Sequence, residues 1–251
     1  MKIDKVLWSS SVEFSDFWNV NSMIHNKFLG LECILLLHGK RDQCDVSEKY
    51  GKVIEFEFGE GRNALSELCF NKFHYTQNEP ETTWLVGDMD QIPLQQNHFI
   101  NLVKDVPEDF YVHLAEDAIC SLGEKDWKKE RGALVGHYHV AKGKVFKEAL
   151  SLSNSLQSDV AKMLDKADKD NMKIWAFEEF HTADLIKENN YLDKFTGFSR
   201  PHVRKICRSH GCRFDPDTDY VDIHCPRPFS SHKEQIHAIL KTFWEDFDEN
   251  Y

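Results

Sequence analysis

The stretch Thr83-Trp-Leu-Val-Gly-Asp-Met-Asp-Gln-Ile-Pro93 guides the interpretation of the whole chain. The apolar residues Trp84 to Val86 predict a short buried strand, and a glycine then lets the backbone leave it. Asp88 and Asp90 follow, separated by one residue, and alternate residues of an extended segment face the same side. Both carboxylates can therefore point toward one site at the carboxyl end of a strand, where open α/β sheets bind ligands. Two hard oxygen donors at such a place suit Mg²⁺ or Mn²⁺.

The segments around this stretch alternate between strand-like and helix-like patterns. Glu32 to His38 is a continuous apolar run ended by a glycine, which is typical of a strand buried on both faces. Residues 16–29 carry apolar side chains close to helical spacing. Similar patterns predict strands at 5–10, 52–58, 109–114, 133–140 and 220–224, and helices at 62–75, 97–103, 144–153, 173–186 and 233–244. The order β-α-β-β-α-β before residue 90 predicts an α/β domain with a largely parallel sheet.

Composition narrows the class of protein. The chain has 251 residues, of which 41% are hydrophobic and 29% charged, as in ordinary soluble globular proteins. A formal net charge of -11 argues against a general nucleic-acid binder, which would carry a basic face. No window approaches the ~18 apolar residues of a membrane-spanning helix, and the first residues lack the apolar core of a signal peptide. The seven scattered cysteines argue against a disulfide framework and indicate a reducing, cytoplasmic compartment, while peripheral membrane contact stays open.

With the strand before it and Ile92-Pro93 after it, the segment Val86–Pro93 resembles the metal-binding turn of the GT-A class of nucleotide-sugar-dependent glycosyltransferases. The resemblance implies a GT-A-like α/β fold, with a largely parallel central sheet flanked by helices. Residues 1–251 would form a single domain, in which 1–95 are a Rossmann-like nucleotide-binding half. Residues 96–251 would be the half for donor sugar and acceptor, with a C-terminal helix. The implied partners are a UDP- or GDP-linked sugar and a hydroxyl acceptor, a saccharide or glycoconjugate.

The same resemblance implies roles for individual residues in the nucleotide half. Asp90 would ligate Mn²⁺ or Mg²⁺ directly, and Asp88 would approach the ribose or reach the metal through water. Ser9 and Ser10, at the end of the first strand, would line the base and ribose, although serines there also suit a loop or a helix cap. Arg62, at a glycine-rich helix start, would contact base or phosphate, or would simply be a solvated arginine.

Residues later in the chain complete this expected site. The resemblance implies His224 as an additional metal ligand and Arg227 as a diphosphate contact, against the alternative of a loop between prolines. His137 and His139 are two apart in a strand-like run, so we expect both rings on one side of a strand. There they would bind metal or line the donor and acceptor pocket, or would be half-exposed strand histidines.

Glu178 and Glu179 are the candidates for the general base. In inverting enzymes of the GT-A class, a carboxylate at such a helix start takes the proton of the acceptor hydroxyl. Adjacent helical residues diverge by about 100°, so one acid can enter the site, and we favour Glu179 over Glu178. We expect the helix dipole to lower the pKa of either acid. The alternative is a pair of acids that only stabilise a helix N-terminus.

Other functions remain open on the sequence. A haloacid-dehalogenase-like phosphatase also uses Asp-x-Asp after a strand, but Ile92 stands where that class usually has Thr or Val. A non-catalytic module that binds a nucleotide sugar or zinc is a second alternative. The candidate zinc ligands of such a module are His202, Cys207, His210, Cys212 and Cys225. They lack paired CxxC spacing, so we favour the alternative that the irregular, basic residues 200–219 form a loop over the site. There the cations would attract the diphosphate or an anionic acceptor; they are Arg204, Lys205, Arg208 and Arg213.

Overall fold

The structure is a computed structural model that describes residues 1–57, 59, 61–116, 128–129, 132–171, 174–200, 204–208, 213–215 and 217–251. For residues 62–63 and 174–176 the backbone alone is described.

A mostly parallel sheet forms the centre of the molecule. Within the described residues, seven strands are ordered β3-β2-β1-β4-β7-β6-β8. They are β1 (Lys5–Ser11), β2 (Glu32–His38), β3 (Lys52–Phe56), β4 (Thr83–Val86), β6 (Tyr111–His113), β7 (His139–Lys142) and β8 (Phe195–Gly197). β7 runs antiparallel to both β4 and β6, and the other neighbours are parallel. The predicted α/β class with a largely parallel central sheet is confirmed.

Alternation along the central strands gives the sheet two apolar faces. In β1, Val6 and Trp8 join one apolar cluster while Leu7 joins the other. In β4, Leu85 faces the first cluster, and Trp84 and Val86 face the second. A strand that is buried on both faces needs apolar residues at every position, which explains the continuous runs in the sequence.

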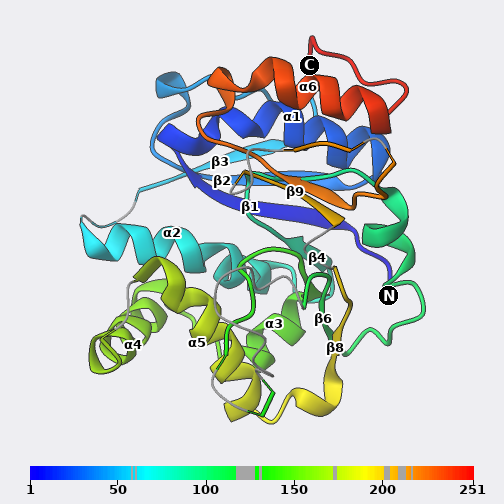
Figure 1. Ribbon diagram of the computed structural model, residues 1–251. Coiled ribbons are helices and arrows are strands. Elements are labelled where there is room, and N and C mark those ends of the chain that lie inside the picture. The colour runs from blue at the N-terminus through cyan, green and yellow to red at the C-terminus, as the bar shows by residue number, and fades with distance from the viewer. Residues whose placement is uncertain are drawn as a thin grey trace.

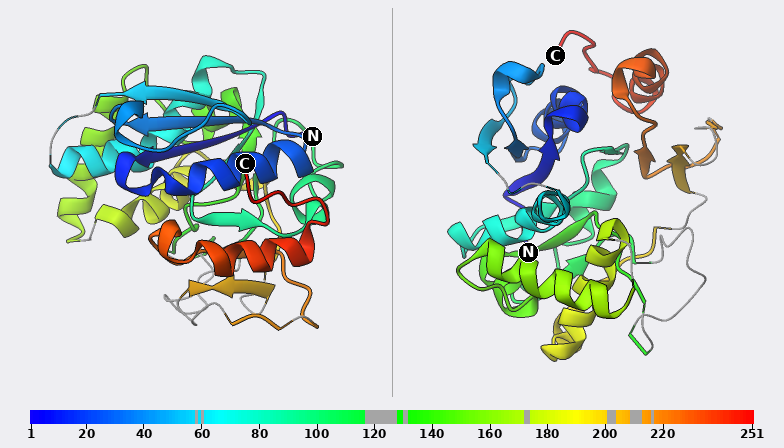
Figure 2. Two further views of the ribbon diagram at one scale, coloured as in Figure 1. Left: turned by 90° about the horizontal axis from the view of Figure 1, so that it is seen from above. Right: turned by 90° about the vertical axis from the view of Figure 1, so that its left-hand side faces the viewer.

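Helices cover the two faces unequally (Figure 1). On one face lie α1 (Trp18–Met23) and α6 (Lys233–Phe243), and the right-hand view of Figure 2 shows both on the side opposite α2–α5. On the other face lie α2 (Arg62–Tyr75), α3 (Gly143–Ala149), α4 (Leu156–Lys169) and α5 (Ile174–Glu188). The shorter turns are η1 (Val12–Phe17), η2 (Ile24–Phe28), η3 (Arg41–Gln43), η4 (Thr76–Asn78), η5 (Asn97–Asn101), η6 (Leu192–Lys194) and η9 (Phe229–Ser231).

A small second sheet connects the Asp-x-Asp turn to the end of the chain. It has the order β5-β10-β9, from β5 (Gln91–Pro93), β10 (Asp222–His224) and β9 (Lys205–Cys207). β10 pairs antiparallel with β5, and the Cys225 amide donates a hydrogen bond to the Asp90 carbonyl at 2.8 Å. This pairing places β10 directly beside the residues that follow the second aspartate.

The predicted elements agree with most of the structure, and the differences are in short strands. β5, β8 and β9 were not expected, and residues 200–219 were predicted to be irregular. The strand predicted at 133–140 forms later, at His139–Lys142. None of the described helices combines the length and the apolar character needed to cross a membrane.

Candidate active site

The two aspartates follow β4 in a tight turn, with different surroundings. The Gly87 amide donates to Leu7 of β1, and the Gln91 amide donates to the Asp88 carbonyl, which closes the turn. The Asp88 side chain is 39% exposed, whereas that of Asp90 is 4% exposed. Both carboxylates therefore lie at the carboxyl end of a central strand, where we predicted them.

Asp88 is paired with a buried lysine from α2. The Lys72 ammonium lies 2.7 Å from Asp88 Oδ1 and 2.7 Å from the Gly136 carbonyl oxygen. It also lies 3.2 Å from Glu178 Oε1, and its side chain is only 4% exposed. Burial opposes the charge of Asp88, but Lys72 and His137 together hold the pKa of Asp88 well below its ordinary value. Lys72 thus balances the charge of carboxylates from two elements.

The tautomer of His137 follows from its partner. Arg200 Nη2 lies 2.9 Å from His137 Nε2, and a guanidinium group can only donate, so Nε2 must accept. Burial holds the pKa of His137 at about 3, so the ring is neutral and its proton is on Nδ1. That nitrogen faces Asp88 Oδ2 at 3.7 Å. Arg200 is itself fully buried and ion-paired with Asp222 of β10 at 2.8 Å.

Glu178 and Glu179 reach the same region from α5. Glu179 Oε1 accepts a hydrogen bond from the Gly136 amide at 3.1 Å, next to the carbonyl that binds Lys72. Burial raises the pKa of Glu178 to about 7, although Lys72 opposes this rise. Burial likewise raises the pKa of Glu179 to about 7. The expectation that the helix dipole lowers these pKa values is wrong, because α5 begins at residue 174 and burial outweighs the dipole in its second turn.

Asp90 is surrounded by cations from the small sheet and the turn that follows it. Its Oδ2 atom lies 2.7 Å from Arg208 Nη1 and 2.6 Å from Arg227 Nη2. His224 Nε2 approaches the same oxygen at 3.4 Å. The predicted neighbours His224 and Arg227 do therefore lie beside Asp90, although they are far from it in the sequence. Burial opposes the charge of Asp90, but His224 and Arg227 hold its pKa below the ordinary value.

The two histidines predicted on one strand have different environments. Tyr138 between them adopts a φ of 66°, and β7 begins only at His139, so the regular alternation of a strand does not apply. His137 contacts Asp88, as described above. His139 is fully buried and bonds to Tyr111 Oη and to the Val135 carbonyl, both at 2.8 Å. The expectation that both lie on one extended strand is therefore wrong.

The remaining predicted residues of the nucleotide half lie at the end of β1 and the start of α2. Ser9 Oγ lies 3.3 Å from His38 Nε2, and buried Ser10 donates to the Ser11 carbonyl. Arg62 begins α2, but its side chain lies outside the described residues.

The candidate zinc ligands are only partly described. His202, His210 and Cys212 lie outside the described residues. Cys207 Sγ lies 3.7 Å from His224 Nδ1, and Cys225 is buried. Among the residues that the structure describes, no group of three His, Cys, Asp or Glu side chains could hold a metal ion by itself.

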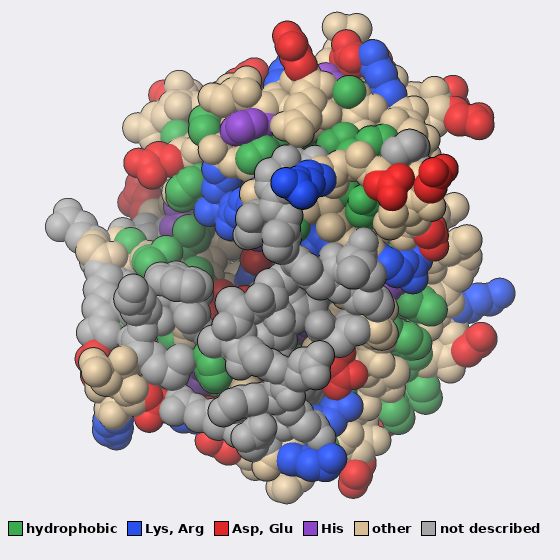
Figure 3. Space-filling model, in the orientation of Figure 1, with side chains coloured by type: hydrophobic (Ala, Val, Ile, Leu, Met, Phe, Trp, Pro, Cys, Tyr) green, Lys and Arg blue, Asp and Glu red, His purple; other side chains and the backbone are tan. Residues whose placement is uncertain are grey.

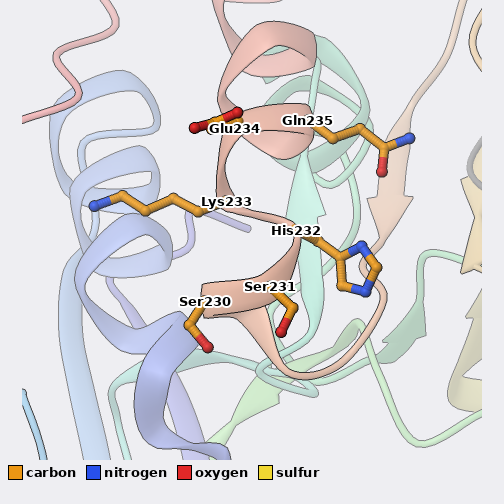
Figure 4. Close-up of a pocket in the computed structure, with 6 residues that line it drawn as sticks. All are labelled: Ser230, Ser231, His232, Lys233, Glu234 and Gln235. Carbon is orange, nitrogen blue, oxygen red and sulfur yellow. The ribbon is translucent and has the colours of Figure 1, made fainter.

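A depression of about 400 Å³ lies at the start of α6, lined by Ser230, Ser231, His232, Lys233, Glu234 and Gln235. Figure 4 shows that these side chains point in different directions rather than toward one point. The face of the molecule in Figure 3 carries Lys and Arg side chains close to acidic ones. We place the candidate site at the aspartates, where buried charges of both signs converge.

The sequence did not identify two of the cations in this site, Lys72 and Arg200, and it predicted Arg208 only as part of a basic loop over the site. Lys72 had a weak signal, because it lies next to Phe73 on a helix that packs into the core. Arg200 and Arg208 belong to the segment that was predicted to be an irregular basic loop over the site. Arg200 is held by its ion pair with Asp222 of β10, and Arg208 directly follows β9, which pairs with β10.

Comparison with known proteins shows the fold of the chain. Family profiles and curated protein sequences give no match. Among solved structures, the glycosyltransferase GlyE of Streptococcus pneumoniae TIGR4 has a TM-score of 0.56 and 11% identity and covers 100% of this chain. This chain spans only 62% of that structure's length. The galactosyltransferase LgtC, solved with donor and acceptor sugar analogs, has a TM-score of 0.54 and 10% identity, and the match covers 98% of each chain.

The fold of this chain is therefore GT-A-like, as the resemblance implied. At these identities the similarity establishes the architecture alone, and the chemistry must be argued from the residues of this chain.

Proposed function

We propose that the protein is a glycosyltransferase that moves a sugar from a nucleoside diphosphate sugar to a hydroxyl acceptor, a saccharide or glycoconjugate. The main observation in support of this proposal is the group of charged side chains that converge at the end of β4. Two aspartates lie there between a buried Lys72 on one side and Arg208, Arg227 and His224 on the other. Similarity to solved glycosyltransferases in fold supports the same class of reaction.

The donor set around Asp90 fits a divalent metal that is completed by its substrate. A carboxylate oxygen and an imidazole nitrogen 3.4 Å apart suit Mn²⁺, and Asp88 offers an exposed carboxylate two residues away. Such ions commonly take one or two carboxylates and fill the other positions with water and phosphate. We therefore propose that Asp90 and His224 ligate Mn²⁺ or Mg²⁺, with Asp88 through water. When bound, the metal would neutralise charge on the leaving diphosphate.

The basic side chains would bind the rest of the donor. Arg227 is 42% exposed and carries its guanidinium over the Phe14 ring at 4.8 Å, so it can reach a ligand beside the Asp90 carboxylate. Arginine suits a diphosphate because its planar group binds oxyanions through two donors at once. Ser9, Ser10 and Arg62 keep their proposed contacts with base, ribose or phosphate. His137, held by Arg200, would face the donor side of Asp88.

Glu179 is the proposed general base of an inverting displacement. A general base works best when its pKa lies near the working pH, and burial raises that of Glu179 to about 7. Glu178 has a similar pKa, but its carboxylate lies against the Lys72 ammonium, which favours a role in charge balance. Glu179 would take the proton of the acceptor hydroxyl as that oxygen attacks the anomeric carbon.

Incubation with a panel of UDP- and GDP-linked sugars and Mn²⁺ tests the function. We expect slow release of nucleoside diphosphate that Asp90→Ala abolishes, while Asp219→Ala, which removes an exposed carboxylate paired with Arg204, leaves it unchanged. Release of phosphate from phosphomonoesters, without sugar-nucleotide turnover, would instead identify a phosphatase. Stoichiometric zinc with no turnover would identify a binding module. A cytoplasmic location remains a prediction from the scattered cysteines.

A further inference from the structure

The Asp90 carboxylate, which we propose as a metal ligand, is already paired with two guanidinium groups. Arg208 Nη1 and Arg227 Nη2 both contact Asp90 Oδ2, and Arg227 Nε lies 2.9 Å from the same oxygen. A buried, unpaired carboxylate is unfavourable, so these contacts stabilise Asp90 when no other cation is present. A divalent ion bound to this oxygen would meet two positive groups at hydrogen-bond distance. The ion and the arginines therefore compete for one atom.

The two arginines are placed so that they can leave. The Arg208 side chain is 32% exposed and that of Arg227 is 42% exposed, whereas Asp90 is 4% exposed. Arg208 directly follows β9, and Arg227 lies in the turn after β10. Both are long side chains outside the strands, so a change of side-chain rotamer can move the guanidinium groups without breaking the strand pairing. Lys72, in contrast, is buried on a helix and bound to a backbone carbonyl.

We infer that Arg208 and Arg227 occupy the metal position on Asp90 before metal and donor bind, and that they transfer to the diphosphate when metal and donor bind. This inference rests on the proposed function. A diphosphate supplies the oxyanions that both guanidinium groups lose when they leave Asp90. Metal and nucleoside diphosphate then bind cooperatively. The diphosphate draws the guanidinium groups away from Asp90, which removes their repulsion of the metal. The metal in turn displaces them from Asp90, which frees them to bind the diphosphate.

Mn²⁺ binding measured by electron paramagnetic resonance tests the inference without any turnover. In the absence of nucleotide, we expect the Arg208→Gln/Arg227→Gln double variant to bind Mn²⁺ about tenfold more tightly than the unmodified protein. At saturating Mn²⁺, we expect the same variant to bind UDP or GDP about tenfold more weakly by calorimetry. Thermal unfolding of each variant shows whether it is folded, and the two single variants replace the double one if it is not.

Arg204→Gln is the matched control. Arg204 precedes β9 and pairs with Asp219 on the surface, so its loss should change neither affinity. Equal Mn²⁺ affinity in the unmodified protein and the double variant would overturn the inference while leaving metal binding intact. Absence of Mn²⁺ binding in every variant, with and without UDP or GDP, would overturn the proposed metal site as well. Tighter Mn²⁺ binding together with weaker UDP or GDP binding would support the exchange.

Discussion

Asp88 and Asp90 are separated by one residue, yet their charges are balanced in opposite ways. The partner of Asp88 is a lysine that is 4% exposed, anchored on α2 and bound to the Gly136 carbonyl. The partners of Asp90 are arginines that are about a third or more exposed and belong to a turn and a strand end. The cation beside Asp88 is therefore part of the core, whereas the cations beside Asp90 face the solvent.

This difference distinguishes a cation that stabilises the fold from cations that a ligand can displace. A buried pair is strongly coupled to folding, because removal of one member leaves the other uncompensated. A cation on a half-exposed side chain is held less firmly, so another cation can replace it beside the carboxylate. We therefore expect changes around Asp88 to alter stability and proton chemistry, and changes around Asp90 to alter ligand binding.

The largest expected effect is on folding, at Lys72. Lys72→Met leaves Asp88 and Glu178 without their ammonium, and we expect the free energy of unfolding to fall by about 3–5 kcal/mol. Urea denaturation measures it. Lys144→Met, which breaks an exposed pair with Glu81, should cost less than about 1 kcal/mol. Adding Glu178→Gln to Lys72→Met should recover part of the loss. Equal losses of unfolding free energy in Lys72→Met and Lys144→Met would show that the pair of Lys72 with Asp88 stabilises the fold no more than a surface pair does.

Loss of the proposed base should lower turnover strongly. We expect Glu179→Gln to reduce kcat about a hundredfold or more, with a much smaller change in the affinity for nucleoside diphosphate. The pH–rate profile of the unmodified protein should have an ascending limb near pH 7, and this limb should disappear in the variant. If Glu178→Gln removes the limb and Glu179→Gln does not, Glu178 is the general base and Glu179 is not.

The raised pKa of Glu179 also predicts how stability depends on pH. The folded protein binds this proton up to about pH 7, whereas the unfolded chain releases it near the ordinary value. Stability from this group is therefore complete at low pH and is lost as pH rises through 7. We expect the fall in Tm between pH 5 and pH 8 to be a few degrees smaller in Glu179→Gln.

The exposed Glu81 provides the control for this measurement. Hydrogen bonds from Lys144 and Lys142 lower its pKa, so it stays ionised across the whole interval. Glu81→Gln should leave the dependence of Tm on pH unchanged. If Glu179→Gln does not alter the dependence of Tm on pH, the pKa of Glu179 is not raised.

The smallest effect is spectroscopic and concerns His137. Nitrogen-15 NMR near pH 6 should show a neutral ring with hydrogen on Nδ1 and none on Nε2, because Arg200 donates to Nε2. A ring protonated on Nε2 would mean that the Arg200 contact is not maintained in solution. The side of the site around Asp88 would then be less fixed than the comparison with Asp90 implies.

The sequence was informative where structure is local. The apolar run from Trp84 to Val86 predicted the strand before Asp88, and the continuous run at Glu32 to His38 predicted another central strand. The juxtaposition of Asp90 with His224 came only from the resemblance to GT-A enzymes, since no periodicity relates them. Short strands such as β5 and β9 contain too few residues to show a period, and their pairing is decided by distant partners.

Two features of the site had little or no local signal in the sequence. The positive φ at Tyr138, which separates the surroundings of His137 and His139, is uncommon for a residue with a side chain. The burial of Lys72 depends on carboxylates contributed by β4 and α5, so an ordinary helical lysine in the sequence becomes an interior one only in the folded chain.

The pairing of β10 with β5 has a consequence for biosynthesis. As the chain leaves the ribosome, β1 to β4 and both aspartates are complete well before residues 222–224 are made. Until then β5 lacks its neighbour, and Asp90 lacks the cations of the C-terminal segment. The nascent protein can pair its first parallel strands early, but the candidate site is complete only after residues 222–224 have been made.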